Sequence, residues 1–291
     1  EPSRPRGAGG VKFGVAIFPT EYAMHPAALG AALEERAFES LWVAEHSHIP
    51  ASRATPWPGG ADLPQMYYDV MDPFVALSAA AATTTELKLA TGICLVGQRD
   101  PIQTAKQVAS LDVISGGRFL FGIGGGWNAE EMANHGTEFV GRWKLVRERI
   151  EAMKSLWADD PAEYHGDLVD FDPVVANPKP VQRPHPPIHV GGGAPGGPRR
   201  AARYGDGWIP LGGRDGDIVE QMALVADEAA KVGRDPAEIE ISLYNSPTEE
   251  SELERLAAAG VARVVFGLPS ADADTVLPYL DHLAGLADRI G

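Results

Sequence analysis

Residues 118–136 read RFLFGIGGGWNAEEMANHG, and the chain is organised around the pattern in this stretch. Phe119 to Ile123 is short and apolar, which predicts a buried strand. Three consecutive glycines, Gly124 to Gly126, follow the strand and let the backbone come close to a flat or anionic group. A tight strand-to-helix connection without a ligand would explain the same glycines, so the rest of the sequence has to decide between the two interpretations.

The same unit, a short apolar strand followed by a helical stretch, recurs along the chain. The predicted strands cover residues 11–18, 41–44, 87–96, 119–123, 188–190, 207–211, 239–244 and 261–267. Alternation of this kind predicts a parallel sheet, and eight units predict a closed (β/α)8 TIM barrel of the α/β class. An open doubly wound sheet is the alternative that the pattern leaves open.

Two long segments interrupt the repeat, at about residues 47–72 after strand 2 and about residues 159–187 after the helix that follows strand 4. The first is rich in Pro and Gly, carries Trp57, Tyr67 and Tyr68, and has the length of a functional or mobile loop. The second predicts a small hairpin or lobe. We therefore expect one domain over residues 11–291, preceded by a flexible leader over residues 1–10 that resembles no signal peptide.

Composition limits the classes of partner. The formal net charge of −15 argues against nucleic acid and anionic membrane surfaces, although a local cluster of Arg could still hold an anionic cofactor. The single cysteine, Cys94, rules out an intrachain disulfide and fits a reducing compartment. No apolar run is long enough to span a bilayer. These features predict a cytoplasmic protein that acts on a small-molecule substrate.

Residues 191–196 read GGGAPG and follow a predicted strand directly. A dinucleotide site of the Rossmann type would need an acidic residue at the end of the next strand, but Gly212, Gly213 and Arg214 stand there. Backbone N–H groups at a helix N-terminus nevertheless favour a phosphate, and Arg199 and Arg200 add positive charge. We expect phosphate binding here, with a plain helix-start turn as the alternative.

His46 and His48 form an H-x-H pair, which is a spacing found in metal sites. The later strands do not complete such a site, because His189 lies inside its strand and no carboxylate follows strand 8 until Asp272. No metal is therefore expected. An imidazole at the carboxyl end of a strand makes His46 a candidate for proton transfer, with a hydrogen-bonded rim residue as the alternative.

A longer signature reads G-x-G-x-G-W, then an acidic residue and a glycine, then F-x-x-R and L-W. It stands at Gly122, Gly124, Gly126, Trp127, Glu131, Gly136, Phe139, Arg142, Leu156 and Trp157, and Glu45-His46, residues 91–93, Asp100-Pro101 and residues 205–208 also match. From Val11 to the C-terminus the chain resembles the bacterial-luciferase-like superfamily of oxidoreductases, in particular its branch that uses the deazaflavin coenzyme F420. Met132 departs from the pattern, in which a Phe is usual.

This resemblance implies the place of a cofactor. The flat ring would rest across the strand ends against a bulge at Gly92-Ile93, where relatives carry a non-prolyl cis peptide. Glu45 would contact the ring or the ribityl chain, and the phosphate would lie on the glycines after strand 5. The implied cofactor-binding residues are Glu45, Gly92, Ile93, Cys94, Gly126, Gly192, Gly193, Ala194, Gly196 and Gly197, and His46 is the implied catalytic acid or base.

Trp127 stands where part of this family has a residue for proton transfer. Sugar-phosphate dehydrogenases of this family have a Glu in that place for proton transfer, so the second proton-handling group cannot be carried over and sugar-phosphate oxidation is not expected. Aromatic Trp127, with Trp57 and Tyr67 as further substrate-binding candidates, suggests a flat, apolar or aromatic substrate.

The resemblance therefore implies hydride transfer between coenzyme F420 and a small organic substrate. One alternative is an FMN-dependent monooxygenase that receives reduced flavin from a partner reductase, and another is a cofactor-binding protein that has lost catalysis. Family members are commonly homodimers. The amphipathic segment 142–153 with Leu156-Trp157 could supply the interface, or the same face could pack on the barrel.

Overall fold

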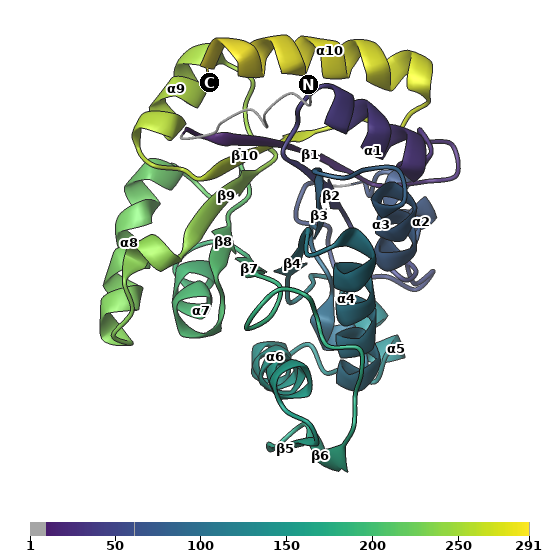
Figure 1. Ribbon diagram of the computed structural model, residues 1–291, viewed down its shortest axis with the longest axis vertical. Coiled ribbons are helices and arrows are strands. Elements are labelled where there is room, and N and C mark those ends of the chain that lie inside the picture. Colours follow the sequence, from purple (N-terminus) through teal and green to yellow (C-terminus); the bar gives the residue numbers. More distant parts are fainter. Residues whose placement is uncertain (1–9, 61, 291) are drawn as a thin grey trace.

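The structure, a computed structural model, describes residues 10–60 and 62–290. Within these residues eight parallel strands close into a barrel in the order β1-β10-β9-β8-β7-β4-β3-β2 (Figure 1). Their bounds are β1 (Lys12–Ile17), β2 (Ser40–Val43), β3 (Lys88–Thr91), β4 (Phe119–Ile123), β7 (Ile188–Gly191), β8 (Gly207–Ile209), β9 (Glu240–Tyr244) and β10 (Arg263–Gly267). The predicted TIM barrel is confirmed. The leader predicted over residues 1–10 lies outside the described residues, apart from Gly10.

Helices surround the barrel, and local sequence signals start several of them. Asp72 and Asp100 accept backbone N–H groups as N-caps and are each followed by a proline in the first turn, where no N–H is needed. The helices are α1 (Pro26–Glu35), α2 (Met66–Asp69), α3 (Pro73–Ala81), α4 (Pro101–Ser115), α5 (Ala129–Asn134), α6 (Arg142–Ala158), α7 (Gly196–Tyr204), α8 (Ile218–Lys231), α9 (Glu250–Ala258) and α10 (Ala273–Ile290), with short 3₁₀ turns at Val96–Gln98 and Pro236–Glu238.

The third strand is shorter than predicted. The apolar run over residues 87–96 predicted one strand, but β3 ends at Thr91. Gly92 donates its N–H to Val43 O, the Gly92-Ile93 peptide is cis, and Cys94 rejoins β4 by donating to Gly122 O. The chain therefore leaves the regular ladder at Ile93 and returns to it at Cys94, which forms the bulge that the resemblance implied.

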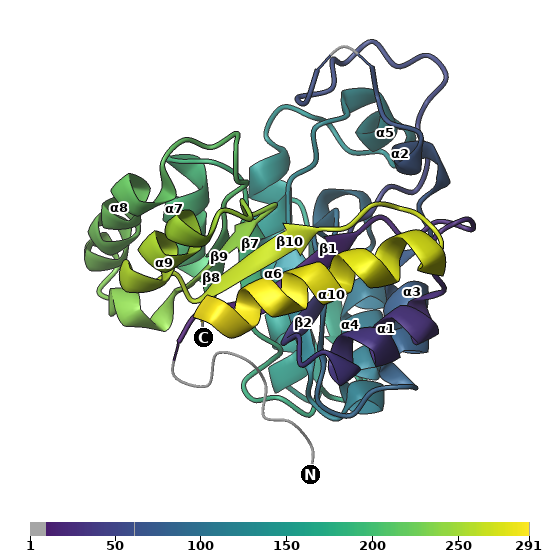
Figure 2. The ribbon, with the colours of Figure 1, turned by 90° about the horizontal axis from the view of Figure 1, so that it is seen from above.

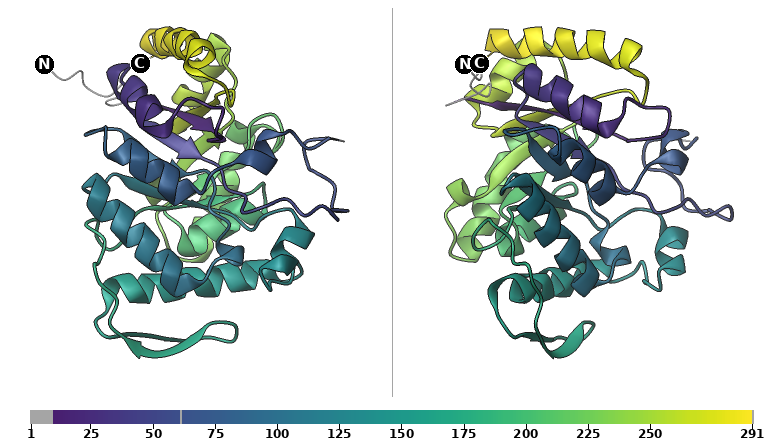
Figure 3. Two further views of the ribbon diagram at one scale, coloured as in Figure 1. Left: turned by 90° about the vertical axis from the view of Figure 1, so that its right-hand side faces the viewer. Right: turned by 45° about the vertical axis from the view of Figure 1, so that its right-hand side comes forward.

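The two long segments differ in form. Residues 47–60 and 62–65 run irregularly beside α5, on the side of the barrel seen at the upper right of Figure 2. After α6 the chain forms the antiparallel hairpin β5 (Ala162–His165) and β6 (Asp170–Val174), which stands away from the barrel at the bottom of both views in Figure 3. Leu156 and Trp157 at the end of α6 are buried, and the Trp157 indole donates to Ala105 O. These two residues therefore pack inside the chain and do not form an interface.

A buried ion pair closes the amino-terminal end of the barrel. Arg263, which is fully buried, donates Nε to one carboxylate oxygen of Glu39 and Nη2 to the other, each at 2.7 Å. Its Nη1 donates to Ser242 Oγ at 2.8 Å. Burial opposes ionisation of Glu39, but the charge and hydrogen bonds of Arg263 lower its pKa to about 2. The pair is therefore charged at neutral pH.

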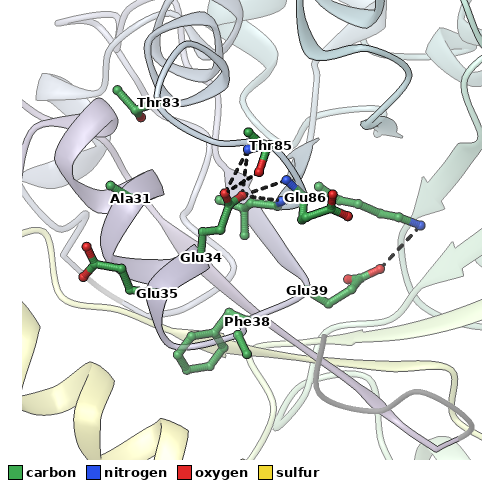
Figure 4. A pocket seen from close by; sticks show the side chains of 11 residues that line it. Ala31, Glu34, Glu35, Phe38, Glu39, Thr83, Thr85 and Glu86 are labelled. Carbon is green, nitrogen blue, oxygen red and sulfur yellow. Dashed lines mark hydrogen bonds and ion pairs between the residues drawn. The ribbon is translucent and has the colours of Figure 1, made fainter. Parts of the chain in front are cut away.

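A cavity of about 410 Å³ lies at the same end, between α1 and the start of β3 (Figure 4). The carboxylate of Glu34 in its wall accepts the backbone N–H groups of Thr85, Glu86 and Leu87. Glu39 is paired with Arg263. Glu34 therefore holds the turn before β3 onto α1, Glu39 belongs to the ion pair, and both carboxylates have structural partners.

Candidate functional site

A cavity of about 590 Å³ opens at the carboxyl ends of the strands, where TIM-barrel enzymes place their chemistry. Six of the eight strands contribute residues that follow them, and β9 contributes its last residue, Tyr244. Pro58 and Tyr67, from the long segment after β2, cover one side. The lining comprises Phe18, Ala44, Glu45, His46, Pro58, Tyr67, Gly92, Ile93, Leu95, Gly124, Gly125, Gly126, Trp127, Phe139, Arg142, Trp143, Gly191, Gly192, Gly193, Arg200, Ile209, Leu211, Arg214, Asp215 and Tyr244.

Most of the residues proposed from the sequence meet in this cavity. The members that line it are His46, Glu45, Gly92, Ile93, Gly126, Gly192, Gly193, Tyr67 and Trp127, whereas Cys94, Ala194, Gly196, Gly197 and Trp57 do not. Cys94 is fully buried behind the wall, and Trp57 packs edge-on against Tyr67. A Cβ on Gly197 would lie 2.0 Å from Gly192 O, so this glycine lets α7 pack closely on the strand end.

His46 is fixed on one edge by a carboxylate. Its Nδ1 lies 2.7 Å from Glu131 Oε2, and the other oxygen of Glu131 accepts the Ser47 N–H at 3.1 Å. The Glu131 side chain is fully buried. Aromatic rings flank the imidazole, with centroid separations of 5.4 Å to Tyr67 and 5.8 Å to Trp127. The ring therefore has one defined orientation in the cavity wall.

Glu130, the neighbour of Glu131, holds the covering loop. Its carboxylate accepts the N–H groups of Ala54 and Thr55 at 2.9 and 3.1 Å and the Thr55 hydroxyl at 2.6 Å. Ser47 Oγ lies 2.9 Å from His48 Nδ1 and 2.6 Å from His135 Nε2. The first half of the loop is thus attached to α5 and to the residue after it.

Glu45 lines the cavity, but its carboxylate is engaged within the protein. Oε2 accepts the Leu95 N–H at 2.6 Å, and Oε1 accepts Arg99 Nε at 2.6 Å. Arg99 also donates to Asp72, the N-cap of α3. The contact with a cofactor that the resemblance implied for Glu45 remains a prediction, and its carboxylate holds the bulge and α3 together.

Two arginines form the opposite wall. The Arg142 guanidinium stacks 3.7 Å from the Phe139 ring centroid and donates Nε to Gly125 O, and the Arg200 guanidinium stacks 3.5 Å from the Trp143 ring centroid. Burial lowers the pKa of both. Within the described part of the chain neither forms an ion pair with a carboxylate. These are partly buried cations without counter-ions in a protein of net charge −15.

The glycines between these walls provide backbone contacts. Among residues 10–60 and 62–290, no hydrogen bond is donated by the N–H of Gly193 or Ala194. Arg200 lies on one side, since its Nη1 would be 3.7 Å from a Cβ on Gly192. The Asp215 carboxylate lies on the other, 2.9 Å from the place of a Cβ on Gly193. An anion therefore fits beside Arg200, and hydroxyl groups fit beside Asp215.

Tyr244 supports the bulge. Its hydroxyl donates to Gly92 O at 2.9 Å, and a Cβ on Gly92 would lie 2.6 Å from its ring. Burial raises the pKa of the Tyr244 phenol well above its ordinary value. The hydroxyl is therefore a constant donor, and Gly92 is required for the contact.

Several of these residues were not assigned a role by sequence reasoning. Glu131 belongs to the signature, but its contact with His46 depends on where α5 lies. Arg200 was noted for its charge alone, and nothing in the sequence marked Trp143 as its stacking partner. Asp215 follows a glycine pair that reads as an ordinary loop.

Two features are absent over the described ranges. No group of three or more His, Cys, Asp or Glu side chains is arranged to hold a metal ion. No helix combines the length and apolar character that crossing a membrane requires.

The chain is similar to proteins of one known family. A model of the family described as luciferase-like monooxygenase matches residues 12–266. The uncharacterised protein Rv0953c of Mycobacterium tuberculosis is 40% identical over 276 residues, which cover 94% of this chain and 97% of that protein. The FMNH2-dependent dimethylsulfone monooxygenase of Pseudomonas putida is 33% identical over 158 residues, 53% of this chain and 43% of its own.

A solved structure shares the fold. It is an F420-dependent secondary alcohol dehydrogenase in complex with an F420-acetone adduct, and it superposes with a TM-score of 0.76 at 17% identity over 97% of this chain and 99% of its own.

Proposed function

Since the chain belongs to the luciferase-like monooxygenase family, we propose that it is an oxidoreductase that binds coenzyme F420 and transfers hydride to or from a small, apolar or aromatic organic substrate. The proposal joins two ideas: an anionic flavin-type cofactor lies across the strand ends, and His46 handles the proton beside it. The proposed setting is a cytoplasmic homodimer.

The observation that carries the proposal is the pair Arg142 and Arg200. Placing a guanidinium out of water without a counter-ion costs free energy, and an acidic protein has carboxylates available to prevent it. Both cations instead face one cavity, next to N–H groups without partners and to glycines that leave the backbone open. An anionic ligand with a flat ring accounts for all three features.

The residues present fit such a cofactor. Arg200 and the N–H groups of Gly193 and Ala194 would hold its phosphate, and Asp215 would accept hydroxyls of its sugar-alcohol chain. The bulge at Gly92-Ile93, supported by Tyr244, offers a surface for the ring. A deazaflavin supplies two-electron hydride chemistry when bound.

The protein's own part in the reaction is to orient the substrate and move one proton. Trp127, Tyr67 and Phe18 form an aromatic wall, which favours a flat or apolar substrate. His46 lies in that wall and presents its free nitrogen to the cavity, so it would donate or accept the proton that accompanies the change at the substrate.

Fluorescence titration with coenzyme F420 and with FMN tests the proposal. We expect quenching of F420 fluorescence by the purified protein and a weaker response with FMN. FMN binding without F420 binding would overturn the deazaflavin assignment and favour the alternative, an FMN-dependent monooxygenase supplied by a partner reductase. That alternative is supported by the FMNH2-dependent relative.

Two variants test the anion site. Losing a hydrogen bond to a charged group costs about 1.5–3 kcal/mol, so Arg200→Gln is expected to weaken cofactor binding by about 10- to 150-fold. Arg199→Gln is the matched control, because Arg199 is exposed on the same helix and does not line the cavity. Equal affinities for the two variants would remove Arg200 from the site.

A further inference from the structure

His46 is confined so that only one of its ring nitrogens is available to the cavity. Nδ1 lies 2.7 Å from Glu131 Oε2, while the rings of Tyr67 and Trp127 flank the imidazole. His46 itself lines the cavity, whereas Glu131 does not. Nε2 is therefore the nitrogen that can meet a substrate, and any effect of Glu131 on that substrate passes through His46.

The carboxylate of Glu131 is itself held in place. Oε1 accepts the Ser47 N–H at 3.1 Å, and the Glu131 N–H donates to Asn128 Oδ1 at 3.3 Å. The side chain is fully buried, so water does not compete for its oxygens. An ionised carboxylate only accepts hydrogen bonds, which requires the proton of a neutral His46 to be on Nδ1. Nε2 is then bare and can take a proton.

We infer that Glu131 is the positioning residue for His46. It selects the tautomer with the proton on Nδ1 and stabilises the imidazolium that forms when Nε2 is protonated. Its role in catalysis rests on the proposed function, but its effect on the His46 tautomer does not. Glu131 thus acts through His46 and carries no proton itself, so it does not replace the acidic residue that Trp127 displaces.

A secondary alcohol and the matching carbonyl compound serve as the test case, because oxidation of an alcohol releases one proton together with the hydride. Oxidation of the alcohol would break its C–H and O–H bonds and form the carbonyl double bond. A bound deazaflavin would supply the acceptor for the hydride, and His46 Nε2 would take the proton. Reduction of the carbonyl compound runs through the same groups in reverse. The Glu131 carboxylate would remain the hydrogen-bond partner of His46 Nδ1 in both directions.

The first experiment reads the tautomer directly in the full-length protein without cofactor. Long-range ¹H–¹⁵N spectra of protein labelled at its histidine ring nitrogens distinguish a protonated nitrogen from a bare one. The chain has eight histidines, so the His46 signals are assigned by their loss in His46→Gln. We expect His46 to carry its proton on Nδ1 in the wild type and to lose that preference in Glu131→Gln.

Glu130→Gln is the matched control for this measurement. It removes a carboxylate from the adjacent position of the same helix, but one that contacts the loop rather than the imidazole. We expect the wild-type His46 tautomer in this variant. The inference is wrong if the wild type carries the proton on Nε2, an outcome that needs no variant to fold, or if Glu131→Gln leaves the His46 pattern unchanged.

A kinetic experiment tests the catalytic consequence. With F420 and a panel of secondary alcohols and ketones, Glu131→Gln is expected to lower kcat by about 10²-fold, in the range of general acid-base effects. The cofactor dissociation constant should change less than about threefold, since Glu131 lies outside the cavity lining.

Failure of the proposed function can be distinguished from failure of the role inferred for Glu131. A wild-type protein that binds no F420 sinks the proposed function, while the tautomer result still decides the role of Glu131. A wild type that turns over substrate with unchanged kcat in Glu131→Gln sinks the catalytic consequence alone. Partial recovery of kcat in Glu131→Asp relative to Glu131→Gln would support a role for the carboxylate charge over one for packing.

Discussion

The ion pair at the amino-terminal end of the barrel predicts a defined acid lability, which Glu39→Gln should reduce. Glu39 has a pKa of about 2 in the folded protein, compared with an ordinary value of 4.5. A shift of this size is worth about 3 kcal/mol of stability above pH 4.5. Because the folded pKa is the lower one, that stability is lost as the pH falls from 4.5 towards 2, and about 2 kcal/mol of it is gone at pH 3.

A second group acts at higher pH. Burial, with the Arg263 charge nearby, lowers the pKa of His189 from 6.5 to about 4. Between pH 6.5 and pH 4, His189 therefore binds a proton in the unfolded chain but not in the folded one. The stability of the folded protein consequently also falls as the pH drops through this range. This slope should be present in both the wild type and Glu39→Gln. Glu240, whose pKa is also lowered to about 2, keeps part of the slope below pH 4.5 in the variant.

At neutral pH the substitution itself should cost about 3–5 kcal/mol, because it leaves the Arg263 guanidinium buried without its bidentate partner. The assay is urea unfolding followed by circular dichroism at intervals from pH 7 to pH 3. Glu254→Gln, which changes an exposed glutamate, is the control and should follow the wild type. The reasoning is refuted if the curves of the wild type and Glu39→Gln stay parallel between pH 4.5 and pH 3.

Three further substitutions probe the site. Glu130→Gln removes the acceptor of two N–H groups and one hydroxyl in the covering loop, so hydrogen exchange over residues 48–60 should speed up; unchanged exchange there would contradict the attachment. Gly197→Ala puts a Cβ 2.0 Å from Gly192 O, so it should lower the melting temperature and weaken cofactor binding, and a variant with wild-type values of both would show that α7 can move away. Tyr244→Phe deletes the hydroxyl that donates to Gly92 O; we expect about 1 kcal/mol less stability and a shifted absorption spectrum of bound cofactor, and an identical spectrum would separate Tyr244 from the ring.

The barrel was predictable from the sequence because short stretches of chain are enough to define its strands and helices. Each strand is a short apolar run, and each of α3 and α4 begins at an aspartate followed by a proline, so the order of elements follows from nearest neighbours in the chain. The end of β3 was not predictable in the same way. Residues 92–96 are as apolar as the strand before them. The end of the strand shows only in three dimensions, where the Gly92-Ile93 peptide is cis and the chain bonds to β4 again through Cys94.

The cavity was predictable in outline and not in its contacts. Strand ends meet at one face of a barrel, which brought His46, Trp127 and Gly192 together from the fold alone. The partner of His46 lies 85 positions along the chain, on a helix of six residues whose placement no periodicity defines. The stacking of Arg200 on Trp143 likewise joins two elements through side-chain geometry that appears only in three dimensions.

One consequence follows from the short helix α5. Its consecutive residues Glu130 and Glu131 serve two different segments, since one fastens the loop over the cavity and the other aligns the imidazole inside it. The covering loop and the His46 imidazole therefore share one short helix as their anchor. A homologous loop transplanted in place of this one would have to keep its contacts with Glu130 or bring its own α5. A new α5 would also replace the residue that aligns His46, so the loop and the orientation of the imidazole would then change together.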